Sequence, residues 1–175
     1  SWPVLIAQLA WFMHWKEFYD IIIILKYIIK KIKPQNISKN YIDTINHVST
    51  KKFIYFSKRG KNKKTKIDLQ DYIKKLGENE FLFGIFQAKI HVANFKLTIK
   101  EKKIYIGFLV FLKYQGKSII KNSFTKILKI KIFKINKFKK IFLGVDEKNI
   151  NAVKLYKKLG FKYKKNSKKI MYLNL

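Results

Sequence analysis

The side chains whose types and spacing suggest chemistry are concentrated near the C-terminus, in residues 149–161. Four of them recur at intervals of three and four residues and so share one face of a helix: Ala152, Leu155, Tyr156 and Leu159. Asn149 or Asn151 can cap the start of this helix, and Gly160 suits the left-handed position after its last turn. The segment therefore predicts a short amphipathic helix that carries a phenol on its buried face.

The composition excludes several kinds of site. A chain of 175 residues fits one domain with a short extension. It contains no cysteine, which excludes disulfides, thiolate metal ligands and a cysteine nucleophile. Its three histidines show no metal-ligand spacing, so we expect no metal site: His14, His47 and His91.

The formal net charge of +30 is the other unusual property of the composition. Arg59 is the only arginine, and the abundant residues Lys, Ile, Asn, Phe and Tyr share AT-rich codons, so an AT-rich genome explains the profile. Arginine is the side chain best suited to bidentate recognition of guanine and phosphate. We therefore do not expect nucleic acid as the partner, although the charge should attract acidic ligands.

The N-terminal segment is apolar but interrupted by charges. Neither Ser1–Trp15 nor Ile21–Ile32 reaches the roughly 20 apolar residues that span a bilayer, and the lysines follow the apolar run, unlike those of a signal peptide. Two interpretations stay open: the end of a truncated upstream region, or an amphipathic helical pair that lies on a membrane or on a partner surface through residues 1–33. Because Pro34 breaks the pattern, we place an extension at residues 1–34 and a domain at 35–175. We expect the protein to be cytoplasmic.

Residues 36–76 predict helices before the main run of strands. A helical pattern at Tyr41, Ile45 and Val48 is followed by a strand-like stretch at 53–56 and an exposed, lysine-rich loop at 57–64. Thr65 and Asp68 have the spacing of a capping box, and a helical stripe follows them up to Gly77.

The rest of the chain predicts an α+β fold. Strands are expected at residues 80–86, 90–98, 104–112, 141–145, 161–165 and 170–175, with helices at 120–128 and 149–159. Short links favour antiparallel pairing of the first three strands. The helix at 120–128 favours one parallel crossover.

Four segments together resemble the GNAT superfamily of acyl-CoA N-acyltransferases. The spacing N-x-x-A-x-x-L-Y-x-x-x-G-F at 149–161 resembles its last motif, and Tyr114–Ile120 resembles its coenzyme A loop, Q/R-x-x-G-x-G/A. His91–Leu97 and Ile104–Phe108 are similar to H-I-G-N-I-K-L and A-E-I-G-I in a branch that includes ribosomal-protein N-terminal and amino-sugar acetyltransferases. The resemblance implies a mixed, mostly antiparallel central sheet flanked by helices, with a C-terminal β-α-β-α-β half that binds the coenzyme.

The resemblance also implies an acetyl-CoA-dependent N-acetyltransferase that uses no metal. Strand 104–112 would splay from strand 141–145 so that the pantetheine arm bonds to strand edges, and Tyr156 would protonate the departing thiolate. The loop would hold the pyrophosphate at a helix N-terminus. The residues implied to bind the coenzyme are Phe111, Leu112, Gln115, Gly116, Lys117, Ser118, Ile119, Ile120 and Asn149.

The acceptor implied by the resemblance is a primary amine on a small molecule, and a nucleotide-linked amino sugar is our first choice. A protein or peptide N-terminus is the first alternative. The second is a GNAT-fold binding module that has lost catalysis.

Three positions depart from the family's pattern. Ser118 and Ile120 stand where the loop has small residues, so we expect Ser118 to cost about 1 kcal/mol if its backbone is left-handed and Ile120 to obstruct the coenzyme. Many members carry a glutamate where this chain has Tyr105. His91 is a candidate base, the alternative being a strand residue with satisfied hydrogen bonds, and the base stays unassigned.

Overall fold

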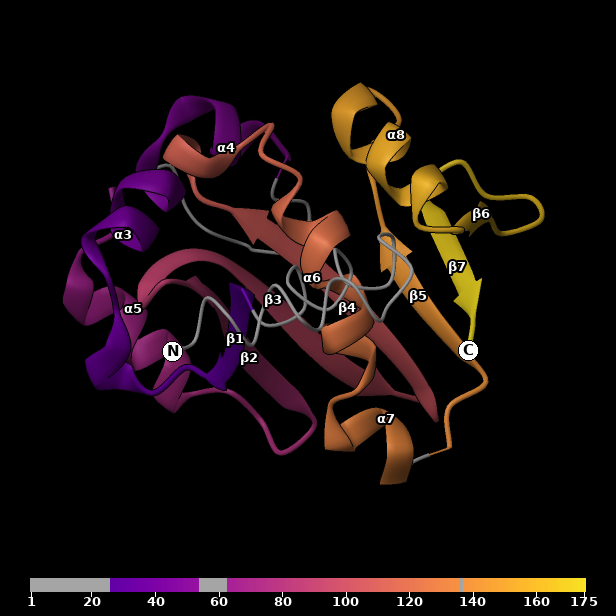
Figure 1. Cartoon of the computed structure of the whole chain (residues 1–175), viewed down its shortest axis with the longest axis horizontal. Coiled ribbons are helices and arrows are strands. Elements are labelled where there is room, and N and C mark those ends of the chain that lie inside the picture. Colours follow the sequence, from indigo (N-terminus) through magenta and orange to yellow (C-terminus); the bar gives the residue numbers. More distant parts are fainter. Residues whose placement is uncertain (1–25, 54–62, 136) are drawn as a thin grey trace, which may run out of the picture.

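The computed structural model describes residues 26–53, 63–135 and 137–175 (Figure 1). Seven strands in these ranges form one sheet in the order β1-β2-β3-β4-β5-β7-β6. Their bounds are β1 Tyr27–Lys31, β2 Glu80–Gln87, β3 Ile90–Lys100, β4 Lys103–Val110, β5 Lys140–Gly144, β6 Lys162–Tyr163 and β7 Ile170–Asn174.

Helices connect and cover these strands. They are α3 Lys39–Asn46, α4 Val48–Phe53, α5 Lys66–Lys74, α6 Ile119–Leu128, α7 Lys131–Ile135 and α8 Ile150–Lys158, with 3-10 turns η1 Pro34–Asn36 and η2 Leu112–Tyr114. The capping box predicted at the start of α5 is present, since Thr65 accepts from the Asp68 N–H and Asp68 accepts from the Thr65 N–H.

All neighbouring strands in this sheet are antiparallel except one pair. β4 and β5 run parallel, joined by the crossover through α6 and α7. This arrangement confirms the predicted α+β class and the mostly antiparallel central sheet.

The sheet is covered on both faces because its strands alternate buried side chains between two cores. One core joins α6 and α8 to the sheet through Ile106, Ile141 and Met171. The other joins α3 and α5 to Leu82 and Phe111. In Figure 1, α6 and α7 lie in front of the strands and α5 lies behind them.

The sheet begins before the domain boundary expected near residue 35. Strand β1 pairs with β2, and Tyr27 is only 1% exposed, so residues 27–31 belong to the folded unit. No period-2 alternation marks this strand, because Tyr27 and Ile28 lie in an apolar run among lysines. A helical pair over residues 1–33 is therefore wrong for residues 27–31, while residues 1–25 lie outside the described ranges, and their membrane contact stays a prediction.

Two further elements differ from expectation. Phe53 ends helix α4 instead of starting a strand, and residues 54–56 lie outside the described ranges. Helix α7 was not predicted. In the part of the chain that the structure describes, no helix is long and apolar enough to cross a membrane.

Candidate active site

The parallel strands β4 and β5 separate soon after they meet. Only Ile104–Ile141 and Tyr105–Phe142 are paired, although β4 continues to Val110 and β5 to Gly144. On its other edge β4 pairs with β3 along its whole length. The second half of β4 therefore presents an unpaired main-chain edge toward β5, which is the kind of edge that an extended ligand can bond to. The splay that the resemblance implied is present.

The turn before α6 exposes main-chain donors. Gly116 and Ser118 both have left-handed backbones, with φ of 74° and 54°. Ser118 is the N-cap of α6, but its side chain makes no capping hydrogen bond, and the first bond that closes the helix runs from Asn122 N to Ser118 O at 2.9 Å. The N–H groups of the first turn thus have no partner inside the helix. Together with the helix dipole, they suit an anion such as a phosphate.

The remaining residues of this turn leave room for a ligand. A Cβ added at Gly116 would meet nothing within 4 Å. The Lys117 ammonium lies 5.3 Å from the Tyr114 ring centroid, on the exposed surface of the turn. The expected cost of about 1 kcal/mol for a left-handed serine applies to Ser118, because its backbone has that conformation.

Ile120 does not obstruct this turn, and the expectation that it would is wrong. Its side chain is 1% exposed and packs in the core shared by α6 and the sheet. Ile119 is buried in the same core. Because both side chains point inward, only their main-chain groups face the region in front of the helix. A GNAT-fold module without catalysis thus loses the support of a bulky Ile120 and keeps only that of the left-handed Ser118.

Phe111, Leu112 and Gln115 were predicted to contact the coenzyme, and each already makes contacts within the protein. The Phe111 side chain is fully buried, and its N–H donates to Val92 O at 3.0 Å. The Leu112 N–H donates to Thr44 Oγ1 at 3.1 Å. Gln115 Nε2 donates to Val110 O at 3.3 Å, which ties the turn back to the end of β4. The coenzyme contacts predicted for Phe111, Leu112 and Gln115 stay predictions.

Helix α8 has Asn149 at its N-terminal cap and Tyr156 on its buried face. Asn149 caps the helix, since its Oδ1 accepts from the Ala152 N–H at 3.2 Å. Tyr156 is buried, and its ring lies 6.0 Å from the Phe108 ring of β4 and 6.0 Å from the Phe161 ring. Phe108 lies beyond the last β4–β5 pair, so Tyr156 stands beside the open part of β4.

Burial widens the pH range over which Tyr156 stays protonated. Desolvation raises the pKa of its phenol from 10.0 to about 12. Within the described residues the hydroxyl makes no hydrogen bond. The phenol is therefore neutral near pH 7 and carries a proton that it can donate.

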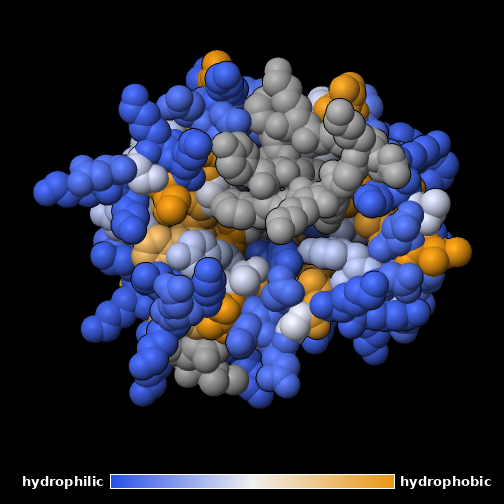
Figure 2. Space-filling view, turned by 180° about the vertical axis from the view of Figure 1, so that it is seen from behind, coloured by the Kyte–Doolittle hydropathy of each residue, from blue (hydrophilic) through white to orange (hydrophobic). Residues whose placement is uncertain are grey.

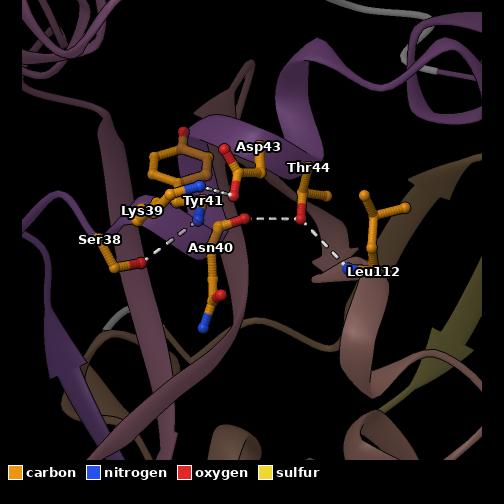
Figure 3. Close-up of polar contacts among 7 residues, drawn as sticks. All are labelled: Ser38, Lys39, Asn40, Tyr41, Asp43, Thr44 and Leu112. Atoms are coloured by element: carbon orange, nitrogen blue, oxygen red, sulfur yellow. Dashed lines mark hydrogen bonds and ion pairs between the residues drawn. The ribbon is translucent and has the colours of Figure 1, made fainter.

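Helix α3 holds the corner between β4 and the turn (Figure 3). The Thr44 hydroxyl donates to Asn40 O at 2.7 Å and accepts from the Leu112 N–H, 68 residues away. The ring of Tyr41, one helical turn earlier, stacks on Phe111 at 5.7 Å. The sequence indicated Tyr41 only as a helical position. The contact of Thr44 was not predicted, because a threonine inside a helix gives no signal of a partner so distant in the chain.

Thr44 offers a direct test of this corner. We expect Thr44→Val to lower the free energy of unfolding by about 1–3 kcal/mol, because it leaves the Leu112 N–H without an acceptor. Thr44→Ser keeps the hydroxyl and should retain most of the stability. Urea unfolding measures the difference, and amide exchange at Leu112 locates it. Equal stability of the valine and serine variants would contradict this role.

His91 is a buried strand residue with both ring nitrogens bonded. Nδ1 lies 3.2 Å from Ser38 Oγ, Nε2 lies 2.6 Å from Asn94 Oδ1, and the ring stacks on Phe86 at 4.5 Å. Burial lowers the pKa of His91 below its ordinary 6.5, against the opposing effect of its bonds to Asn94 and Ala93. These contacts match the structural alternative for His91 and not the role of a base.

The lowered pKa of His91 predicts a pH dependence of stability. Below pH 6.5 the unfolded chain binds a proton on His91 that the folded chain resists, so the free energy of unfolding should fall as the pH falls. Well above pH 6.5 the histidine is neutral in both states and the effect vanishes. We expect His91→Gln to reduce the fall in the free energy of unfolding between pH 6.5 and 5. The same substitution at exposed His47 should leave that fall unchanged. Urea unfolding at each pH measures it, and identical slopes in both variants would be the contrary result.

No candidate metal-binding site is found in the described part of the chain. No group of three or more His, Asp or Glu side chains gathers there in a way that could hold an ion.

Solved structures with the same fold were found in several organisms. Spermidine N-acetyltransferase from Vibrio cholerae, in complex with CoA and spermine, has a TM-score of 0.69 at 18% identity, over 86% of this chain and 96% of that one. PaiA N-acetyltransferase from Thermoplasma acidophilum, in complex with coenzyme A, has a TM-score of 0.63 at 19% identity, over 85% and 99%. A domain from Methanocaldococcus jannaschii has a TM-score of 0.68 at 23% identity, over 86% and 99%. At these identities the likeness shows the fold alone.

One curated protein is similar in sequence. The RecBCD enzyme subunit RecB of Buchnera aphidicola is 35% identical over 155 residues, which are 89% of this chain. The chain spans only 11% of that protein's length, so the match assigns it no activity.

The family comparison covers the site itself. The model of the acetyltransferase (GNAT) family matches residues 69–161, more than half of the chain. The match runs from α5 through the turn before α6 to the end of α8, and so includes the splayed strands, Ser118 and Tyr156. The chain therefore belongs to the acetyltransferase (GNAT) family.

Proposed function

We propose that this protein transfers an acetyl group from acetyl-CoA to a primary amine. The observation that carries the proposal is the opening of β4 from β5 after two residue pairs, beside a buried phenol. The uncapped start of α6 follows the same strand in the chain. Solved relatives with this fold include proteins described as N-acetyltransferases in complex with coenzyme A.

The chain's own groups fit the donor. The first-turn N–H groups of α6, with Lys117 and the dipole of the helix, would bind the coenzyme pyrophosphate. The open edge of β4 would bond to the pantetheine amides. Asn149 would contact the same arm through its amide nitrogen while its oxygen caps α8.

The chemical step then needs one proton donor from the chain. The neutral acceptor amine attacks the thioester carbonyl, the new C–N bond forms, and the C–S bond breaks with its electron pair going to sulfur. Tyr156 gives its phenolic proton to the thiolate, and the proton lost by the amine passes to water, which later restores the phenol. No side chain is assigned as the base.

The charge distribution supports an anionic acceptor. From residue 102 to the C-terminus the chain has 21 lysines and two acidic residues, Asp146 and Glu147. A polycation such as spermidine would be repelled by this half, whereas a diphosphate would be attracted. We therefore propose a nucleotide-linked amino sugar as the acceptor, with an acidic peptide N-terminus as the alternative.

A turnover assay separates these acceptors. Purified protein with acetyl-CoA is offered UDP-linked 4-amino and 2-amino sugars, acidic N-terminal peptides and spermidine, and release of free thiol is followed with mass detection of the acetylated product. We expect turnover of a nucleotide-linked sugar at low salt. Turnover of peptides alone would establish the alternative, and turnover of spermidine alone would contradict the anionic acceptor.

A further inference from the structure

We propose that a row of aromatic rings on the sheet binds the nucleoside diphosphate part of the acceptor. The row consists of Tyr105 on β4, Phe142 on β5 and Tyr172 on β7, and we call it the aromatic row. The inference rests on the proposed function, because it names the part of the substrate that this acetyltransferase would recognise. It also names a surface that can be tested without turnover.

The strand register places the three rings side by side. Tyr105 is opposite Phe142, and Phe142 is opposite Tyr172, so all three side chains project from one face. Their ring centroids are 5.6 Å and 6.4 Å apart, with interplanar angles of 36° and 42°. The neighbours in sequence project to the other face and are fully buried under α6 and α8: Ile104, Ile141 and Met171.

The aromatic row is only partly covered. All three residues keep intermediate exposure, unlike the rings of the two cores. Neither tyrosine hydroxyl has a hydrogen-bond partner among the described residues. Adjacent rings on an open sheet surface are the arrangement on which proteins stack nucleobases.

The charges around the aromatic row are positive. Lys103, Lys140 and Lys162 occupy the same face by register, and the Lys140 ammonium lies 5.0 Å from the Tyr172 ring centroid. The acidic residue in register with the row is Glu80 on β2, and it is ion-paired with Lys96. Figure 2, the view from behind Figure 1, shows hydrophobic residues exposed between blue hydrophilic ones. A planar group that carries phosphates fits such a surface.

The aromatic row also lies at a useful distance from the open strands. Gly107 lies two residues beyond Tyr105, about 7 Å along the strand. A Cβ added at Gly107 would meet nothing within 4 Å. This is where β4 and β5 have parted. A base stacked on the row would leave an attached sugar within reach of the gap where the thioester would lie.

The extent of the row favours one nucleotide over a strand of nucleic acid. Three adjacent strands span about 10 Å across the sheet, which accommodates a single base with its diphosphate. A single-stranded oligonucleotide is the competing ligand, and the experiment includes it.

The test uses UDP as the probe, titrated into the full chain in the presence of saturating acetyl-CoA. The variant is Tyr172→Leu, and the matched control is Tyr163→Leu, because Tyr163 pairs with Met171 on the other face and has its own lysine, Lys157, at 5.9 Å. We expect Tyr172→Leu to weaken UDP at least about tenfold, and the control to change it less than about twofold. Tyr172→Phe keeps a ring and should bind UDP like the original chain.

Three results would overturn the inference: displacement of UDP by acetyl-CoA, equal loss in the Tyr172 and Tyr163 variants, or tighter binding of a dT oligonucleotide than of UDP at 150 mM salt. Failure of the proposed function looks different. In that case UDP binds to the aromatic row, but acetyl-CoA is not consumed with any amine.

Discussion

Replacing Tyr156 with phenylalanine is expected to lower kcat about 100-fold or more while coenzyme binding is unchanged. Loss of a positioned proton donor costs roughly that factor. Phenylalanine keeps the ring contacts with Phe108 and Phe161, and the hydroxyl that it removes has no partner among the described residues. Steady-state kinetics for turnover and calorimetry for acetyl-CoA binding measure the two quantities separately.

The pH profile sharpens this prediction. Because burial raises the pKa of Tyr156 to about 12, the phenol stays protonated through the usual assay range, so it should cause no loss of activity up to pH 10. Tyr163→Phe, at a partly exposed tyrosine on β6, is the control and should be neutral. If Tyr156→Phe turned over as fast as the original chain, another group or water would be the proton donor.

Replacing Ile120 with alanine should have the largest effect on stability. The side chain is 1% exposed in the core between α6 and the sheet, so its truncation should lower the free energy of unfolding by about 2–5 kcal/mol. Ser118→Gly, two residues earlier, should change stability by less than about 1 kcal/mol, since relief of the left-handed strain is offset by the entropy of glycine.

Urea unfolding of both variants distinguishes an inward from an outward Ile120. An outward side chain near the coenzyme would give the opposite pattern: Ile120→Ala would leave stability unchanged and strengthen acetyl-CoA binding. That outcome would contradict the placement of Ile120 in the core.

Local sequence signals predicted most of the fold. The capping box at Thr65 and Asp68, and the helix that begins after Asn149, depend on residues within one turn of each other, and both are confirmed. The strands of the antiparallel meander were also recognisable, since their apolar runs are joined by short links. Tyr156 was identified through the spacing of its motif, and its burial agrees with the predicted face.

What the sequence did not predict depends on contacts between distant segments. Residues 27–31 form a strand only because they pair with β2, more than fifty residues later in the chain. Ile120 looked like an obstruction because its motif position says nothing of the direction in which a helix turns that side chain. The bond from Leu112 to Thr44 and the register of the aromatic row have the same origin, since both need the assembled sheet.

Calorimetric titration with acetyl-CoA, comparing Ser118→Asp with its neutral isostere Ser118→Asn, tests the coenzyme site most directly. Asp and Asn are both favourable N-cap residues that tolerate left-handed backbone, but the carboxylate would repel a phosphate at the start of α6. We predict micromolar binding by the original chain and by Ser118→Asn, and at least tenfold weaker binding by Ser118→Asp, roughly the factor that 1.4 kcal/mol gives. Absence of binding at millimolar acetyl-CoA, or equal affinity of the two variants, would contradict a coenzyme site at this helix.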